Sequence, residues 1–181
     1  IRYRKNLSIN VARAGNVIGG GDWSNDRVIP DCVKSWSKNI AVKIRNPNST
    51  RPWQHVLEVI RGYIQCAILG RSNAKINGEI FNFGPLIHQD KSVIQLINQM
   101  KKNWKKVKWK IKKEKGDKKE SKLLKLNSLK AKKILKWEPV LSFQKTVEMT
   151  ALWYKAFYNK KNCFDLSKDQ IEFYEKKIKK I

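Results

Sequence analysis

The chain has 181 residues, of which 41% are hydrophobic, and it carries a formal net charge of +25. This length suits one domain, or a small domain with part of another, and the apolar fraction excludes disorder throughout. No apolar run reaches the roughly 18 residues that would cross a bilayer, so we expect a cytoplasmic protein with no membrane partner. The first residue is not methionine, and we expect the chain to start within a longer protein.

The cysteines and histidines do not form a metal-binding pattern. Cys32, Cys66 and Cys163 are widely spaced without a C-x-x-C pair, and neither His55 nor His88 has a second ligand at helical spacing. We therefore expect reduced thiols, no disulfide framework and no metal.

Much of the positive charge lies in one lysine-rich segment. Residues 101–136 hold 17 lysines against three acidic residues, whereas all eight arginines lie at or before Arg71. Proteins that read nucleic acids usually use arginine for bidentate contacts with bases and phosphates. The pattern favours solvated lysine-covered faces, so no nucleic-acid partner is expected. A non-catalytic protein that binds polyanions through this segment is the alternative from another class.

In chain order, the first predicted elements alternate between strands and helices. Residues 7–19 predict a buried strand that ends at three glycines, residues 27–38 a helix, and residues 40–45 a short strand. After the turn-forming stretch NPNST, residues 53–69 predict a long helix. The apolar face expected for this helix consists of Val56, Ile60, Tyr63, Ile64 and Ala67.

The second half of the chain continues the alternation. Residues 79–84 predict a strand, residues 92–104 a helix, and residues 107–113 a strand with one wet face. Three helices follow: a short one after an Asn or Ser cap that stops before Pro139, one within residues 141–158, and a last one capped by Asp165 or Ser167. This order is typical of an α/β protein.

The usual catalytic and cofactor motifs are not in the chain. It has no G-x-G-x-x-G turn, and Gly19-Gly20-Gly21 is better interpreted as a permissive turn beside a ligand. No tyrosine is followed by lysine four positions later, and no G-x-S-x-G, H-E-x-x-H or Walker loop occurs. We therefore expect no catalytic residue in this chain.

Polar residues at the ends of the predicted strands are the candidates for ligand binding. They are Asn16, Arg27, Arg45 and Arg51. Residues at the carboxyl ends of strands in an open α/β sheet face the ligand crevice, and guanidinium groups match the oxygens of a pyrophosphate. The alternatives are solvated surface arginines and an asparagine that merely ends a strand.

Five stretches resemble, in order and spacing, the second half of an extended short-chain dehydrogenase of the NAD-dependent epimerase/dehydratase family. They are ARAGNVIGGGDW, DRVIPDCV, IRNPNSTRPWQHVLE, FNFGP and LKLNSLKAKKILKWEPVLSF. Within the family, RAGNVIGGGDW and RNP…RPWQHVLE are most similar to the CDP-glucose 4,6-dehydratases, rather than to dTDP-glucose or GDP-mannose dehydratases or UDP-sugar epimerases. Another nucleotide-sugar epimerase or dehydratase remains the alternative within the family. The resemblance covers about residues 7–160.

The resemblance implies an α/β fold: the C-terminal part of an NAD-binding Rossmann fold with a small mixed α/β substrate-binding domain. Residues 1–25 would end the Rossmann domain. Residues 26–160 would form the nucleotide-sugar-binding portion, interleaved with residual Rossmann elements, and residues 161–181 a C-terminal helix.

The activity implied is an NAD-dependent dehydration of a nucleotide-linked glucose. The sugar is oxidised at C4, loses water across C5 and C6, and regains the hydride at C6, which gives a 4-keto-6-deoxy sugar. In the family the NAD turn, the Tyr and Lys pair, and the eliminating acid and base all lie upstream of this segment. The implied partners are therefore a missing N-terminal half, without which the fragment is expected to be inactive, and a second copy in a homodimer of the complete protein.

The resemblance also assigns roles to single residues. Ala14 would offer backbone contacts to the nicotinamide, and Asn16 a hydrogen bond to the sugar or its phosphate. Arg27 and Val28 would contact the nucleoside diphosphate. Arg45 would lie beside the base, and Arg51 would bind the pyrophosphate.

Several positions depart from the family pattern. Lys119-Glu120-Ser121 stands where a His-Glu-Ala run is usual, and Lys136 precedes Trp137 where Leu-Gly-Trp is usual. Asn82 is interpreted as a structural strand residue and His55 as a packing residue.

Overall fold

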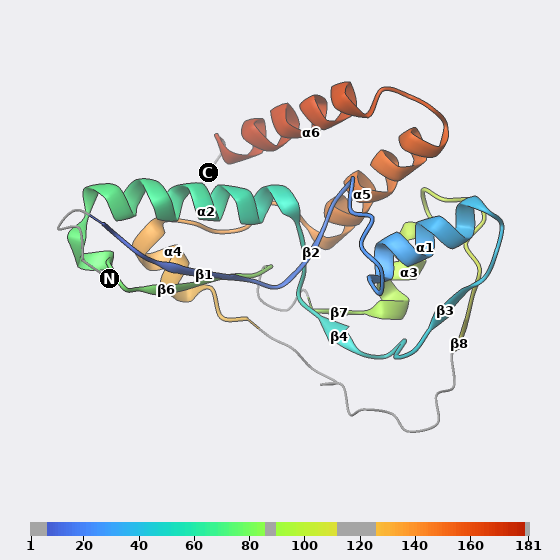
Figure 1. Ribbon diagram of the computed structural model, residues 1–181, viewed down its shortest axis with the longest axis horizontal. Helices are drawn as coiled ribbons and strands as arrows, with labels where there is room; N and C mark the ends of the chain where they lie inside the picture. The colour runs from blue at the N-terminus through green and yellow to red at the C-terminus, as the bar shows by residue number, and fades with distance from the viewer. Residues whose placement is uncertain (1–6, 86–89, 112–125, 180–181) are drawn as a thin grey trace.

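The computed structural model describes residues 7–85, 90–111 and 126–179. Figure 1 shows its helices and strands along the chain. In order they are β1 (Val11–Ala14), β2 (Asn16–Ile18), α1 (Val28–Ser37), β3 (Val42–Ile44), β4 (Thr50–Arg51), β5 (Trp53–His55), α2 (Val56–Ser72), η1 (Ala74–Ile76), β6 (Ile80–Phe83), β7 (Lys91–Ser92), α3 (Val93–Met100), β8 (Trp109–Ile111), α4 (Leu129–Leu135), α5 (Phe143–Tyr158) and α6 (Cys163–Ile178).

The strands pair two by two. The pairs β1–β6, β2–β5 and β3–β8 are parallel, and β4–β7 is antiparallel. Parallel neighbours need long crossover connections, and helices supply them here, as between β1 and β6. The α/β class expected from the sequence is therefore confirmed.

The single strand predicted over residues 7–19 is wrong, because Gly15 divides it into β1 and β2. Gly15 N–H donates to Phe83 O at 3.2 Å, whereas the next residue, Asn16, donates to Pro52 O at 3.1 Å, so the chain changes partner strand within one step. A Cβ on Gly15 would lie 2.7 Å from Pro52 O, so the close approach of the two backbones requires glycine here.

The larger of the cores lies between α1, β3, α3 and α5. The buried side of α1 comes from the spacing of Ile29, Cys32, Val33 and Trp36, and Pro30 is accommodated in its first turn. Trp36 is 1% exposed, and its indole N–H donates to Lys108 O at 2.7 Å. This core therefore holds the first turn of α1 and strand β3 in place.

A second core lies under α2, around Phe81, Phe83 and Trp137. Gly62 permits the contact, since a Cβ there would lie 2.5 Å from the Phe83 ring. Helix α4 packs on α2 and β6 and ends at Lys136, which adopts the left-handed conformation with φ 53°.

The prediction for α2 is wrong in two respects. The helix begins at Val56, because residues 53–55 pair with β2 as strand β5. Its predicted apolar face is largely exposed, with Ile60 at 46%, Tyr63 at 42% and Ile64 at 54%. The buried side is instead built from two glycines, a cysteine, a valine and a glutamate, namely Gly62, Gly70, Cys66, Val59 and Glu58.

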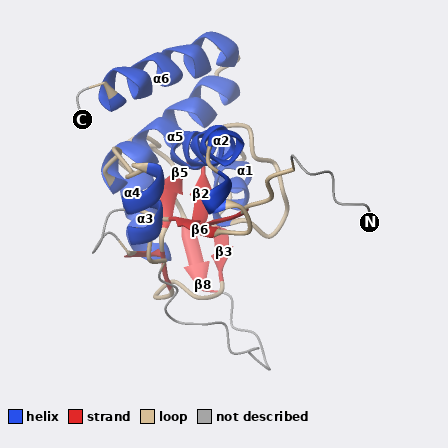
Figure 2. Ribbon diagram, turned by 90° about the vertical axis from the view of Figure 1, so that its left-hand side faces the viewer, coloured by secondary structure: helices blue, strands red, loops and turns tan. Residues whose placement is uncertain are grey.

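The two C-terminal helices lie on one side of the strands (Figure 2). The predicted cap of α6 is wrong: Asn162 caps the helix, accepting from Phe164 N at 3.0 Å and Asp165 N at 3.4 Å. The other predicted helices and strands are confirmed within a few residues of their bounds. The single wet face predicted for the strand over residues 107–113 is wrong, because all three residues of β8 are exposed; residues 112–113 lie outside the described residues. Among the described residues, no helix is long and apolar enough to cross a membrane. Residues 112–125 of the lysine-rich segment, with Lys119-Glu120-Ser121, lie outside the described residues.

Candidate nucleotide-sugar site

A cavity of about 340 Å³ opens between β2, the first turn of α1 and β3. Arg51 of β4, Trp53 of β5 and Tyr154 of α5 also line it. Its lining residues are Asn16, Val17, Ile18, Gly19, Asp22, Asp26, Arg27, Val28, Ile29, Pro30, Asp31, Val42, Lys43, Ile44, Arg45, Asn46, Ser49, Arg51, Trp53, Val93 and Tyr154.

The structure brings five of the six predicted binding residues to this one cavity. Asn16 opens β2, Arg27 and Val28 begin α1, and Arg45 follows β3, while Arg51 lies in β4. These residues are up to 35 positions apart in the sequence and come from four elements. Ala14, the sixth, ends β1 and is not among the cavity-lining residues.

The N-terminus of α1 faces the cavity without a side-chain cap. Arg27 occupies the N-cap position with extended backbone (φ −109°, ψ 132°) and makes no capping hydrogen bond with its side chain. The first N–H groups of a helix have no partner within the helix, and they carry the positive end of its dipole. An anionic group in the cavity would therefore meet backbone donors as well as the Arg27 guanidinium.

The two other arginines differ in their surroundings. Arg51 is 8% exposed and is fixed by its own strand, with Nη1 donating to Thr50 O at 2.9 Å. Arg45 lies at the rim, where its side chain is 53% exposed and stands 4.0 Å from the Asp26 carboxylate. An exposed pair at that distance contributes little stability, so Arg45 can exchange Asp26 for a ligand at small cost.

Acidic residues share the cavity with the arginines. Burial and the neighbouring Asp26 raise the pKa of Asp31, which lies in the first turn of α1. Asp22 and Asp26 follow the three glycines, and sequence reasoning did not single them out. Their nearness to the glycines was the one available signal, since polar residues after such a turn often face a ligand.

Aromatic side chains from α5 hold the loop that follows β2. Tyr154 O–H donates to Asp22 O at 2.7 Å, and burial raises the pKa of this tyrosine. Trp153 covers Gly20 so closely that a Cβ there would stand 2.1 Å from its ring, and Gly21 adopts φ 79°. The three glycines are thus a turn that admits an indole ring and shapes the cavity wall. The sequence held no signal for Tyr154, which is 132 residues from Asp22.

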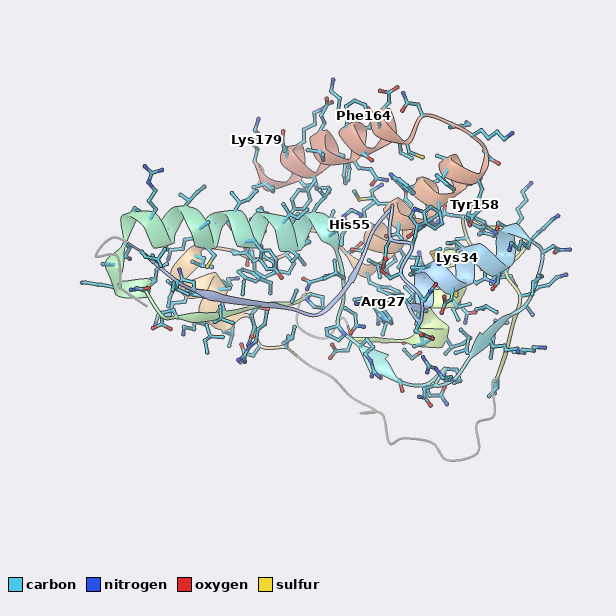
Figure 3. All side chains as sticks on the ribbon, in the orientation of Figure 1. Arg27, Lys34, His55, Tyr158, Phe164 and Lys179 are labelled. Carbon is cyan, nitrogen blue, oxygen red and sulfur yellow. The ribbon has the colours of Figure 1, made fainter. Side chains whose placement is uncertain are left out.

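His55 and Gln54 lie behind this wall with unpaired atoms. His55 Nδ1 accepts from Leu57 N at 3.3 Å and caps α2, while its Nε2 is buried without a partner among the described residues. Burial lowers the pKa of His55 to about 4. Figure 3 shows His55 at the start of α2 and Arg27 at the start of α1. His55 therefore does more than pack, since it begins the helix next to the cavity.

The residues that could meet a dinucleotide are fewer. Ala14 stands at the end of β1, and Asn82 on β6 is held through Nδ2, which donates to Asn127 O at 3.4 Å. The described residues contain no glycine-rich turn that would cradle a dinucleotide pyrophosphate. A complete NAD site is therefore not formed by the described residues alone.

The fold is that of the NAD-dependent epimerases and dehydratases, the extended short-chain dehydrogenases with a Rossmann domain. A UDP-glucose 4-epimerase from Stenotrophomonas maltophila, crystallised with NAD and formylated UDP-arabinopyranose, has a TM-score of 0.72 at 16% identity over 86% of this chain and 50% of its own. The dTDP-glucose 4,6-dehydratase of Bacillus anthracis, in complex with NAD, has a TM-score of 0.63 at 20% identity over 81% of this chain and 44% of its own.

In sequence, the chain is similar to a particular member of this class. It is 41% identical over 164 residues to CDP-glucose 4,6-dehydratase of Salmonella typhimurium, a match that covers 90% of this chain and 45% of the relative. The resemblance to the C-terminal portion of CDP-glucose 4,6-dehydratase is thereby confirmed. The chain spans about half the length of this curated relative. No family model matches the chain.

Proposed function

We propose that this chain is the nucleotide-sugar-binding portion of an NAD-dependent 4,6-dehydratase that converts CDP-glucose to CDP-4-keto-6-deoxyglucose. The observation that carries the proposal is the convergence of Asn16, Arg27, Val28, Arg45 and Arg51 on one cavity, in a chain 41% identical to a CDP-glucose 4,6-dehydratase. The assignment of Asn16 to the sugar, Arg45 to the base and Ala14 to the nicotinamide is part of the proposal.

The diphosphate of the substrate is the part that these residues suit best. The first N–H groups of α1 and the Arg27 guanidinium would take one phosphate, and the Arg51 fork the other. Because Arg51 is almost fully buried, its guanidinium is already ordered, and little side-chain entropy is lost when a ligand arrives. NAD would supply the oxidation and return of the hydride, while residues of this chain bind and orient the nucleotide sugar.

The activity needs a second portion of protein. The proton-transfer pair and the cofactor turn expected of the family are not in this chain, so we propose that it works with a portion equivalent to the other half of its relative. We also propose that the complete protein forms a homodimer, as the family resemblance implies.

Calorimetric titration tests the binding step. CDP-glucose is expected to bind the chain more tightly than dTDP-glucose, UDP-glucose or GDP-mannose. Arg51→Ala is expected to weaken binding about 10- to 100-fold, the cost of losing a hydrogen-bonded charge. Arg51→Lys, which keeps the charge without the fork, should lie between them, and Arg71→Ala at the end of α2 should match the unmodified chain. Equal affinity for all four nucleotide sugars, or no effect of Arg51→Ala, would overturn the proposal.

A product assay tests the reaction itself. The chain is mixed with NAD, CDP-glucose and the N-terminal portion of the Salmonella enzyme, and the sugar product is identified by mass and NMR. A 4-keto-6-deoxy sugar is expected from the mixture and none from the chain alone. An epimerised sugar without loss of water would assign the protein to the epimerases instead.

A further inference from the structure

One carboxylate lies in the cavity close to where the diphosphate of a nucleotide sugar would bind. Asp31, in the first turn of α1, lines the same cavity as Arg27 and Arg45. Asp31 N–H donates to Arg27 O at 3.0 Å, so this carboxylate stands one helical turn beyond the N-cap to which the proposed function assigns a phosphate. A carboxylate weakens the binding of an anion unless it accepts hydrogen bonds from another part of the ligand. Asp31 therefore needs a donor that the phosphates do not supply.

The described part of the chain does not supply this donor either. Burial is the main cause that raises the pKa of the half-buried Asp31, and the charges of Lys34 and Arg45 offset it only in part, without a hydrogen bond. Lys34, further along α1 (Figure 3), is held by the preceding loop, since its Nζ donates to Trp23 O at 2.7 Å. An ionised carboxylate only accepts hydrogen bonds. Asp31 is thus placed to accept one from a ligand.

Arg45 lines the cavity from the end of the neighbouring strand β3. Helix α1 packs on β3, and the charge of Arg45 acts on the pKa of Asp31. Arg45 Nη2 lies 4.0 Å from Asp26 Oδ1, but the Asp26 side chain is 88% exposed, so Arg45 can leave this pair for a ligand. The wall between α1 and β3 therefore offers a carboxylate acceptor and a guanidinium fork within electrostatic range of each other.

This pairing of acceptor and donors matches the edge of one nucleobase. Cytosine presents a 4-amino donor beside the two acceptors N3 and O2, whereas uracil and thymine present the acceptor O4 beside the donor N3–H. A carboxylate accepts from the cytosine amino group, and a guanidinium fork donates to two neighbouring acceptors. Against uracil, the carboxylate would meet O4 and the fork would meet N3–H. Both contacts would then be unfavourable.

We propose that Asp31 and Arg45 read the base, with the Asp31 carboxylate accepting from the 4-amino group of cytosine and Arg45 donating to N3 and O2. The assignment rests on the proposed function, which places the base beside Arg45, and adds Asp31 as the residue that discriminates cytosine from uracil and thymine. The ribose hydroxyls are the other donors near the base. They are common to CDP- and UDP-sugars, so a contact between Asp31 and the ribose would leave base preference unchanged.

Calorimetric titration with CDP-glucose and UDP-glucose tests the role of Asp31. The unmodified chain is expected to prefer CDP-glucose about 10- to 100-fold. Asp31→Asn, whose amide can also donate to O4 of uracil, should reduce this preference at least about 10-fold. Asp26→Asn is the matched control, because it removes the same charge from the same cavity at an exposed position. It should change the preference less than about twofold.

A change in the ligand tests the same contact without altering the protein. A CDP analogue with hydrogen in place of the 4-amino group leaves the Asp31 carboxylate without its donor. It should bind the unmodified chain at least about 10-fold more weakly than CDP, the cost of a lost hydrogen bond to a charged group. On Asp31→Ala, which has already lost the acceptor, the analogue and CDP should bind within about threefold of each other.

The outcomes separate the base assignment from the proposed function. If CDP-glucose is preferred and Asp31→Asn weakens both sugars equally, or the analogue binds the unmodified chain as tightly as CDP, the base assignment is overturned and the proposed function stands. If Asp31→Asn loses the preference but the product assay yields no keto sugar, the reaction is overturned and the base assignment stands. Equal binding of CDP- and UDP-glucose by the unmodified chain overturns both.

Discussion

The cavity region and the α2 region use apolar residues in opposite ways. Around the cavity, the helical spacing of α1 points its large residues inward, and Trp36 is 1% exposed. On α2 the same kind of spacing points outward, and Ile68 is 65% exposed. The first region closes its core within the chain, whereas the second buries glycine and cysteine and leaves its isoleucines exposed. An apolar period therefore locates an apolar face of a helix without telling whether the rest of the described structure buries it.

Glu58 joins the two regions, and its removal is the largest change that we predict. It lies on α2, and its Oε1 accepts from Val140 N at 2.7 Å and Leu141 N at 2.8 Å, just before α5. Its Oε2 accepts from Tyr174 O–H on α6 at 2.5 Å. Glu58→Ala leaves these buried donors without an acceptor. It should lower the free energy of unfolding by about 3–5 kcal/mol in urea titration.

Glu148 supplies the control for that experiment. It is a half-buried residue of α5 that pairs with Lys145 at 3.1 Å near the surface, so Glu148→Ala should cost less than about 1 kcal/mol. If the two substitutions cost the same, Glu58 does not hold the regions together.

His55, at the junction of β5 and α2, should make stability depend on pH. Burial lowers its pKa from 6.5 to about 4, so the folded state keeps it neutral. Above pH 6.5 both states are neutral and stability is complete; as the pH falls toward 4, only the unfolded state binds the proton. About 3 kcal/mol should be lost over this window.

The comparison protein for this pH series is His55→Asn. Asparagine also caps helices but does not titrate, and His88 is common to both proteins. As the pH falls from 6.5 to about 4, the unfolding free energy of the unmodified protein should fall relative to that of His55→Asn. Outside this window the difference between the two proteins should stay constant. Parallel pH profiles would show that His55 is not shielded from water.

Gly20 tests how tightly the cavity region is closed. A Cβ at this position would lie 2.1 Å from Cγ of Trp153, so Gly20→Ala should force the ring or the loop to move, at about 1–3 kcal/mol. The loop also carries Asp22, so CDP-glucose affinity should fall with stability. Gly78→Asn is the control, since nothing lies within 4 Å of a Cβ there and asparagine tolerates its φ of 81°. A stable Gly20→Ala protein with unchanged affinity would mean that Trp153 does not pack tightly against the glycine turn.

Lys136, at the end of α4, gives the smallest effect and the opposite sign. It holds a left-handed conformation at φ 53°, which costs a residue with a Cβ roughly 1 kcal/mol or more. Lys136→Gly should therefore stabilise the α2 region by about 1 kcal/mol in thermal unfolding. Lys133→Gly, inside the same helix, should destabilise it by a similar amount. Loss of stability in both variants would contradict the conformation at Lys136.

Particular residues show how far the sequence alone could lead. The α/β class, the helix at α1 and the choice of Asn16, Arg27, Arg45 and Arg51 as binding candidates were within reach, because strand ends and helix starts follow from local pattern. Val28 came from the family resemblance instead. The break at Gly15 was not, since it depends on Pro52, which approaches from another strand. Nor was Tyr154, because its place beside Asp22 depends on how α5 packs.

By itself, the sequence determined most of the helices, several of the strands, and that the chain resembles the C-terminal half of a nucleotide-sugar dehydratase. Only the tertiary structure decided that Gly19-Gly20-Gly21 admits an indole ring, and that the apolar face predicted for α2 is largely exposed. The physical reason is range: spacing and propensity act over a few neighbouring residues, while burial depends on contacts between segments far apart in the chain.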